Sequence, residues 1–358
     1  MIKNISIFCI KPTQSIREVI ACIDKNQEGI ALVVDKQRHL LGTVTDGDIR
    51  RAILAGVDLD SSAIALLENR TSAKYAKPIV APLGTPKSEL LRLMNEHVIW
   101  HVPLLNKEGK LADMVLISDF VKEAEIPLTA IIMAGGYGTR LSPLTKEIPK
   151  PMLSLGEGPI LKSIIKHLQG SGIRRIHIST HYKPEKIIEY FGDGSSFGVD
   201  LQYLTEDHPL GTAGALGLMS EPKETLLVMN ADILTALDIR AMLSFHREHQ
   251  ANLTVAVQQY EVAVPYGVIQ TEGHLVRSLR EKPKFQCFVN AGIYLIEPSS
   301  FRFVPKSKRF DMTDLIQKLL DEGQIVVSFP IHEYWLDIGK QSDYEKAKED
   351  IKTYNNNK

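Results

Sequence analysis

The stretch IIMAGGYGTRLSPLTKEIPKP, from Ile131 to Pro151, joins an apolar run to a glycine cluster, an arginine and a lysine. Short apolar runs are typical of buried strands, and glycines that follow allow positive φ and close approach of the backbone to a ligand. Backbone N–H groups in such a turn can cradle an anion, although a plain tight turn explains the glycines equally well. The stretch is not a P-loop, because no Gly-Lys-Ser/Thr closes it, and Leu141 replaces the third glycine of a dinucleotide fingerprint.

Outward from this stretch, strand-like and helix-like patterns alternate along the chain. Apolar runs predict strands over 129–135, 174–180, 200–206 and 225–232, and helical spacing predicts helices over 159–172, 184–194 and 214–220. This alternation predicts βαβ units and an α/β fold with a Rossmann-like, mostly parallel sheet. Ligands of such folds bind beyond the carboxyl ends of the strands, which is where the glycine turn falls.

The composition is that of an ordinary globular protein, and it narrows the set of partners. Of 358 residues, 44% are hydrophobic and 24% charged, and the net charge of −1 gives no field that attracts nucleic acid or an anionic membrane. Three scattered cysteines fit a reducing compartment, and no apolar run is long enough to span a membrane. The start of the chain lacks a signal-peptide pattern, so we expect a cytoplasmic protein, and we expect it to form a homo-oligomer.

The first third contains an internal repeat. A shift of 71 residues places Val33 on Leu104, and Asp48 on Asp119. Each copy reads as a strand, a polar turn, a second strand and the start of a helix, and such units need each other to bury their apolar faces. We therefore predict domains over 1–64, 65–125 and 126–358, with a polar bridge before the third.

The repeat resembles a pair of CBS motifs packed as one module, which often binds adenine nucleotides. The ribose-binding pattern of that family is a Ser or Thr three residues before an Asp, which Thr45 and Asp48 match. In the second copy Leu116 replaces the hydroxyl while Asp119 remains. The resemblance implies one adenine-nucleotide site at Thr45 and Asp48; a packing or dimerisation module without a ligand is the alternative.

Two cations and two acids give the glycine turn its chemistry. Arg140 offers a fork of donors to phosphate and Lys150 a mobile point charge, so together they predict a polyphosphate clamp, although each alone is typical of a solvated surface. Asp232 ends an apolar strand and Asp337 follows another apolar stretch. Two such carboxylates over a triphosphate suit Mg²⁺, and the alternative for each is a cap or turn acid.

The motif AGGYGTRLSPLT…PKPM resembles the signature of the sugar-1-phosphate nucleotidyltransferases over about 126–344. The resemblance implies a glycosyltransferase-A-like domain in which Arg140 and the loop hold the triphosphate, Lys150 contacts phosphate at the reacting centre, and Asp232 and Asp337 hold Mg²⁺. The loop residues so implied are Ala134, Gly135, Gly136, Gly138 and Thr139. The common spelling of the family has Gly-Asp where this chain has Ala231-Asp232.

The same resemblance implies a sugar pocket. Lys282 would contact the phosphate of the sugar and Glu281 its hydroxyls, while Gly267 and Asn290 would line the pocket. Each of these residues reads equally well as part of a turn.

Glu206 bears on the choice of base, and we expect Gly211 and Thr212 downstream to contact the nucleotide. Thymidylyl- and uridylyl-transferring relatives often have Gln at this place, which matches the donor and acceptor of uracil and thymine. Guanine presents two adjacent donors, and a carboxylate accepts both. Glu206 therefore favours GTP, and the alternative is that it caps the following turn.

These residues predict nucleotidyl transfer from an NTP to a sugar-1-phosphate. The domain order resembles the guanylyltransferases that act on glucosamine-1-phosphate in bacterial legionaminic-acid synthesis, a surface-glycan pathway. A uridylyl- or thymidylyltransferase and a mannose- or heptose-type guanylyltransferase are alternatives. A nucleotide sensor with a degenerate transferase domain is the alternative from another class.

Overall fold

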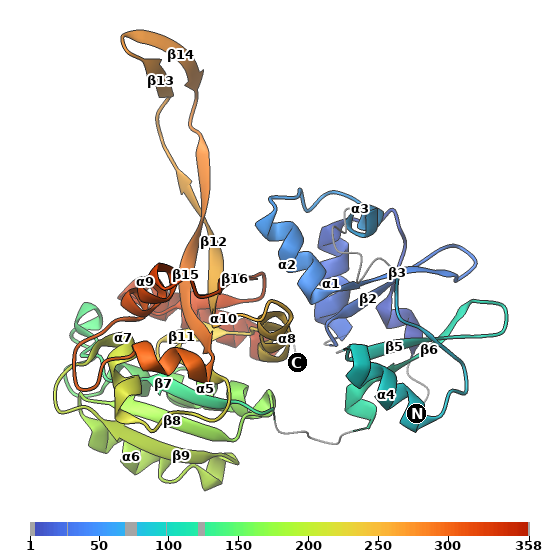
Figure 1. Ribbon diagram of the computed structural model, residues 1–358. Helices are drawn as coiled ribbons and strands as arrows, with labels where there is room; N and C mark the ends of the chain where they lie inside the picture. Colours follow the sequence, from blue (N-terminus) through green and yellow to red (C-terminus); the bar gives the residue numbers. More distant parts are fainter. Residues whose placement is uncertain (1–3, 27, 69–76, 98, 121–125, 357–358) are drawn as a thin grey trace. The chain divides into compact units, whose positions relative to one another are not determined.

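The computed structural model describes residues 4–26, 28–68, 77–97, 99–120 and 126–356. The chain divides into two compact units, Met1–Ala124 and Glu125–Lys358, each with its own core (Figure 1). The predicted third domain begins one residue after this division. Most of the predicted polar bridge before it lies outside the described residues.

The first unit contains two copies of one small α/β motif. Its elements are β1 (Cys9–Ile10), α1 (Ile16–Asn26), β2 (Ile30–Val34), β3 (Leu40–Thr45), α2 (Asp46–Leu54), α3 (Ala63–Glu68), β4 (Ala81–Pro82), α4 (Lys87–His97), β5 (His101–Leu105) and β6 (Leu111–Leu116). The strands form two three-stranded sheets, β1-β2-β3 and β4-β5-β6. β2 and β5 begin 71 residues apart, as do β3 and β6, so the predicted repeat is confirmed as a repeat of structure. The predicted division after residue 64 falls inside α3, whose Leu66 packs into the core of the first copy.

The helix start predicted in each copy follows its second strand. In α2, the backbone N–H and the hydroxyl of Thr45 both donate to Asp48 Oδ2 at 2.9 Å, which closes a capping box. In the second copy, Leu116 N–H donates to Asp119 Oδ2 at 2.9 Å, so the backbone half of the cap persists without the hydroxyl. Thr45 and Asp48 are thus bound to each other, and their contact with a ribose remains a prediction.

The second unit is built on a seven-stranded sheet. Its strands and helices are β7 (Thr129–Met133), α5 (Ile160–Gly170), β8 (Arg175–Thr180), α6 (Pro184–Phe191), β9 (Asp200–Thr205), α7 (Gly211–Gly214), β10 (Leu226–Asn230), β11 (Ile233–Thr235), α8 (Ile239–Glu248), β12 (Leu253–Ala263), β13 (Val268–Glu272), β14 (Leu275–Arg280), β15 (Lys284–Ile296), α9 (Met312–Asp321), β16 (Val326–Ile331), β17 (Trp335–Asp337) and α10 (Gln341–Asn356). Instead of the helix predicted over 214–220, α7 ends at Gly214 and a 3-10 turn, Ala215–Leu218, follows.

The large sheet has the order β16-β12-β15-β10-β7-β8-β9, and only β15 runs antiparallel to its two neighbours. The prediction of an α/β fold with a mostly parallel sheet is confirmed. Both faces are covered, since Ala130 and Ile132 of β7 lie in a core with α5 and α8, and Ile131 between them lies in a core with α9. Strands buried on both faces read as continuous apolar runs, which is why β7 and β10 stand out in the sequence.

Two further findings concern the whole described chain. Cys9, Cys22 and Cys287 are free thiols. Within the described ranges, no helix combines the length and apolarity that crossing a membrane requires.

Candidate active site

A cavity of about 290 Å³ lies at the carboxyl ends of β7 and β10 in the second unit. The two strands pair in parallel, Asn230 beside Met133, and Ala231 N–H donates to Met133 O at 3.1 Å. The chain that leaves β7 and the chain that leaves β10 therefore start side by side, as expected for a ligand crevice. The lining includes Ala134, Gly136, Gly138, Thr139, Arg140, Lys150, Asp232 and Gly339.

A short strand pairing brings together the two acids predicted to bind metal. β11 follows Asp232 directly and pairs antiparallel with β17, so that Ile233 lies opposite Asp337. Ile338 N–H donates to Asp232 O at 3.0 Å and extends this pairing. Carboxylates far apart in the sequence thus become neighbours; Asp232 lines the cavity, and Asp337 lies two residues before Gly339, which also lines it.

Lys150 neutralises one of these carboxylates. Its 3-10 turn, Lys150–Met152, directs the buried ammonium group to Asp232 Oδ2, with which it forms a short ion pair. A buried lysine needs such a partner, because an unpaired ammonium group away from water costs on the order of several kcal/mol. The predicted phosphate-contacting lysine and metal-binding aspartate are thus already in contact.

The remaining carboxylate oxygens fit a divalent cation. Asp232 Oδ1 and Asp337 Oδ1 are buried, and neither accepts a hydrogen bond from any described residue. Burial and the negative charge of Asp232 raise the pKa of Asp337, while Lys150 and Arg140 act in the opposite direction. The two neighbouring carboxylates repel each other, and each has an oxygen without a hydrogen bond from the described residues. Such oxygens are the ligands that a hard cation such as Mg²⁺ prefers.

The glycine turn is shaped by the residues beneath it. Gly138 has φ +64°, a backbone conformation that residues with a side chain rarely adopt. A Cβ there would also lie 3.0 Å from both Lys150 Cβ and Thr145 Cγ2, which leaves too little space for it. Thr145 Oγ1 donates to Gly138 O at 2.9 Å and fixes the turn. Arg140 follows on an exposed 3-10 turn at the rim of the cavity, where its charge reaches Asp337.

Glu206 lies on the other side of the turn. Its buried carboxylate accepts a short hydrogen bond from the Ser179 hydroxyl through Oε1 and a 2.9 Å bond from Leu210 N–H through Oε2. The second bond caps the turn that follows, as the alternative interpretation expected. The carboxylate nevertheless lies against Gly135, where an added Cβ would be 2.8 Å from Glu206 Oε1, so it borders the glycine turn.

His181 and Tyr137 connect the glycine turn to Glu206, a link that the sequence did not predict. Tyr137 Oη lies 3.0 Å from His181 Nε2, and His181 Nδ1 lies 2.8 Å from Glu206 O. Because the carbonyl can only accept, Nδ1 carries the proton and Nε2 accepts from the tyrosine. His181 follows β8 directly and contacts two segments of the site.

The predicted sugar-side residues do not line the cavity. Gly267, Glu281 and Lys282 lie where β12–β13 and β14–β15 connect, with Gly267 close to the Glu281 carboxylate and Lys282 N–H donating to Tyr266 O at 3.2 Å. Asn290 is in β15, where its side-chain oxygen accepts from Gly292 N–H at 3.0 Å.

Gly211 and Thr212, predicted to bind nucleotide, contact another part of the chain instead of the cavity. Thr212 N–H donates to Asp311 Oδ1 at 2.9 Å, and its hydroxyl accepts from Met312 N–H at 2.8 Å.

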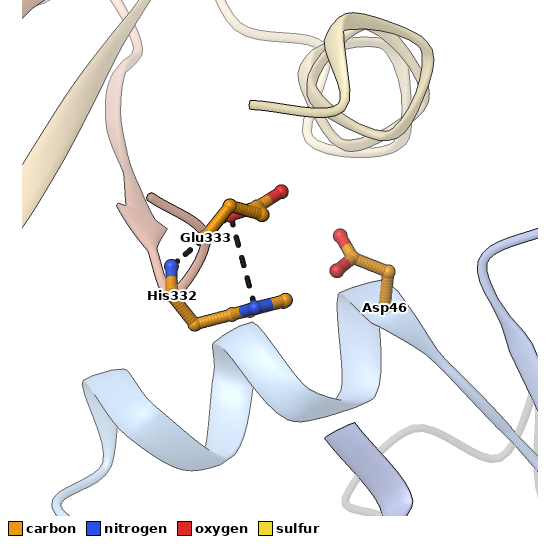
Figure 2. Close-up of side chains that lie close together, drawn as sticks. All are labelled: Asp46, His332 and Glu333. Carbon is orange, nitrogen blue, oxygen red and sulfur yellow. Dashed lines mark hydrogen bonds and ion pairs between the residues drawn. The ribbon is translucent and has the colours of Figure 1, made fainter. Parts of the chain in front are cut away.

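The loop between β16 and β17 precedes Asp337 in the chain and is held in place by Glu333. Figure 2 shows His332 and Glu333 in this loop, with His332 N–H donating to Glu333 Oε2 at 3.1 Å and His332 Nδ1 3.8 Å from the same oxygen. Glu333 Oε1 also accepts from Asp238 N–H at 3.1 Å, which ties the loop to the start of α8. Asp46, the third side chain in the figure, belongs to the first unit, where its carboxylate binds both Arg50 Nε and Arg50 Nη2.

The first unit has a cavity of its own, of about 270 Å³. Its lining includes Lys87, Asp113 and Asp119, all from the second copy of the repeat. Thr45 and Asp48, the predicted ligand pair, do not line it.

Comparison with known families agrees with this site. A family model described as "Nucleotidyl transferase" matches residues 129–354, and one described as "CBS domain" matches residues 1–55. The chain belongs to the nucleotidyl transferase family. The nucleotidyl transferase match contains the whole cavity lining, and the CBS match contains Thr45 and Asp48 but not the second copy.

Relatives of the nucleotidyl transferase domain act on different bases and sugars, as their names state. A mannose-1-phosphate guanylyltransferase of Mycobacterium tuberculosis is 30% identical over 231 residues, which are 62% of this chain and 64% of that protein. A UTP–glucose-1-phosphate uridylyltransferase of Synechocystis is 32% identical over 62% of each chain. A D-glycero-alpha-D-manno-heptose 1-phosphate guanylyltransferase of Aneurinibacillus thermoaerophilus is 32% identical over 63% of this chain and 100% of its own length. The chain thus spans less than two thirds of the first two relatives.

Solved structures lead to the same family. A putative glucose-1-phosphate thymidylyltransferase of Bacillus anthracis has a TM-score of 0.51 and 26% identity over 62% of this chain and 94% of its own. HddC of Yersinia pseudotuberculosis has a TM-score of 0.50 and 27% identity over 63% of this chain and 100% of its own. Guanylyl-, uridylyl- and thymidylyl-transferring proteins therefore all resemble this domain.

Proposed function

We propose that the protein transfers a nucleotidyl group from a nucleoside triphosphate to a sugar-1-phosphate, giving a nucleotide-sugar and pyrophosphate. The observation that carries this proposal is the cavity beside the glycine turn, where the Lys150–Asp232 pair meets the unsatisfied oxygens of Asp232 and Asp337. An arginine at the rim and a buried lysine beside a carboxylate pair suit a magnesium triphosphate better than a neutral ligand.

The residues of the chain supply binding and charge in this mechanism. A phosphate oxygen of the sugar-1-phosphate attacks the α-phosphorus, a new P–O bond forms, and the bond to the β-phosphate oxygen breaks as pyrophosphate leaves. The attacking oxygen is already anionic, so no general base is required. Arg140 and Lys150 offset the charge of the triphosphate. Lys282 lies outside the cavity lining in this structure and would have to reach the bound sugar-1-phosphate to hold its attacking phosphate. Bound Mg²⁺, held by Asp232 and Asp337, would neutralise further phosphate charge.

Within this proposal GTP is the favoured donor. Glu206 borders the glycine turn, and its carboxylate can accept from both donors of guanine while an amide cannot. Each oxygen already accepts one hydrogen bond but keeps a second lone pair. Guanylyltransferases among the relatives support this choice, although a uridylyltransferase of similar identity resembles the chain as well.

We further propose glucosamine-1-phosphate as the sugar substrate and an adenine nucleotide at the CBS pair as a regulator. The support for both is the order of the domains, which resembles the guanylyltransferases of legionaminic-acid synthesis. Replacing Thr45 with Val tests the regulator without removing catalytic groups, and Thr45→Ser is its control because it keeps the capping hydroxyl. Adenine nucleotides should change the turnover of the parent and Ser proteins but not of the Val variant.

The decisive experiment measures pyrophosphate release with Mg²⁺, testing GTP, UTP, dTTP, CTP and ATP against glucosamine-, mannose-, heptose- and glucose-1-phosphates. We expect release with GTP, and Glu206→Gln should lower kcat/KM for GTP by roughly 10- to 100-fold, which corresponds to the loss of one charged hydrogen bond. A preference for UTP or dTTP would keep the reaction and exclude the assignment of the base. No release from folded protein with any pair would favour a nucleotide sensor instead.

A further inference from the structure

The two longest strands of the second unit continue beyond the sheet as an isolated ribbon. β12 pairs with β16 only from Leu253 to Gln258, and β15 pairs with β10 only from Ile293 to Ile296. Residues 259–263 and 284–288 then pair with each other, and the β13–β14 hairpin follows at their far end (Figure 1). We call residues 259–288 the arm.

The ribbon of the arm has two chemically different faces. Directly opposed residues share a face of a sheet, so Tyr260 and Cys287 lie on one face together with Val262 and Phe285. This apolar face carries no charged side chain in the ribbon 259–263 and 284–288.

The polar side chains on the opposite face of the ribbon bond to one another. Lys284 Nζ lies 2.8 Å from Glu261 Oε1, and Gln259 Nε2 donates to Gln286 Oε1 at 2.9 Å. Phe288 also lies on this face, opposite Gln259. A sheet with one polar and one apolar face normally has the apolar face covered.

The side chains on the apolar face of the arm are exposed within the described residues. Tyr260 is 55% exposed and Phe285 47%, and in the hairpin Ile269 and Leu279, which oppose each other, are 55% and 63% exposed. With roughly 100 Å² exposed on each of the six apolar residues Tyr260, Val262, Ile269, Val276, Leu279 and Phe285, two arms would bury about 1,200 Å² in total, which meets the size of a specific interface. Single exposed apolar side chains are ordinary, but a contiguous set of this size marks an interaction site.

We propose that two copies of this chain associate through the apolar faces of their arms. The apolar face of the ribbon carries no charge that a charged partner could pair with, whereas an identical apolar face complements it fully. A two-fold axis would place the same residues of both copies against each other, as in an isologous dimer. Tyr260, Val262, Phe285 and Cys287 have no part in the proposed transfer reaction, and the association is measured without substrate.

The test is the mass of the full chain in solution, by light scattering after size-exclusion chromatography from about 1 to 100 µM. We expect a dimer. The double variant Tyr260→Ser/Phe285→Ser should weaken dimerisation at least about a hundredfold, while Gln259→Ser/Gln286→Ser, on the polar face of the same ribbon, should leave it unchanged. Thermal unfolding confirms that both variants are folded. A monomeric parent protein, a dimer that survives the first variant, or equal dissociation of the second would overturn the proposal.

Cys287 provides a second measurement on the same face. In a Cys9→Ser/Cys22→Ser background, its labelling by a maleimide should slow at least about tenfold as the protein concentration rises through the dimerisation range. A rate that is fast at every concentration means that no partner covers the face. A rate that is slow at every concentration in a protein that light scattering shows to be monomeric means that the arm folds against its own copy, and either result overturns the proposal.

Discussion

Replacing Gly135 with alanine should damage the site through Glu206. A Cβ at Gly135 would lie 2.8 Å from Glu206 Oε1, a separation that requires the buried carboxylate to move. Its hydrogen bonds from Ser179 and Leu210 would then be weakened or lost. At about 1.5–3 kcal/mol for a hydrogen bond to a charged group, we expect the free energy of unfolding to fall by that amount and Tm by roughly 3–10 °C.

Gly136 provides the matched control for this change, because a Cβ there meets nothing within 4 Å. Gly136→Ala should therefore leave Tm unchanged. If Glu206 reads the base, Gly135→Ala should also lower kcat/KM for GTP by roughly 10- to 100-fold more than for UTP, whereas Gly136→Ala should affect both triphosphates alike. Thermal unfolding and steady-state pyrophosphate release measure these effects. Equal melting temperatures for the two variants would refute the contact, and an unchanged GTP-to-UTP ratio would refute the role in base selection.

Three further predictions concern single side chains. Lys150→Met should lower kcat by about 10²- to 10³-fold, while the same change at the exposed Lys146 should not, as measured by pyrophosphate release. Asp337→Asn should raise the Mg²⁺ concentration needed for half-maximal rate at least about tenfold, since one of the two proposed ligands is weakened; an unchanged magnesium dependence would remove Asp337 from the metal site. Burial lowers the pKa of His246, so the folded protein favours the neutral imidazole. The free energy of unfolding is therefore highest above about pH 6.5 and decreases as the pH falls below that value. Chemical denaturation at neutral pH and about pH 5.5 should show a smaller acid loss in His246→Gln, by about 1 kcal/mol or less, and an identical loss would exclude this histidine as a cause.

The sequence predicted the strands and helices of the large sheet because the spacing of apolar residues is visible within each single segment. The helix predicted over 159–172 is observed as Ile160–Gly170, and the strand predicted over 129–135 as Thr129–Met133. The repeat was visible because both copies bury the same positions, and its shift of 71 residues recurs in the strand starts. The two cations at the cavity were predicted from their place after the glycine turn, whereas the choice of metal ligands over cap or turn acids for Asp232 and Asp337 came from the resemblance of their motifs.

Longer-range features gave no local signal. β11 and β17 have three residues each, too few for a periodicity, so their pairing was not predicted. The links from Tyr137 through His181 to Glu206 depend on three separate segments meeting. The apolar face of the arm alternates with a polar one, as in any half-buried strand, and the sequence alone does not reveal that these apolar side chains are exposed within the described residues.

The pairing of β11 with β17 also has a consequence for how the protein is made. During synthesis the sheet strands β7 and β10, Lys150 and Asp232 are available long before Trp335–Asp337 emerges from the ribosome. The carboxylate pair can form only when the C-terminal strand adds to a largely finished sheet. A nascent or truncated chain that ends before β17 can therefore hold the lysine–aspartate pair but not the second acid, so the site is completed among the last steps of folding.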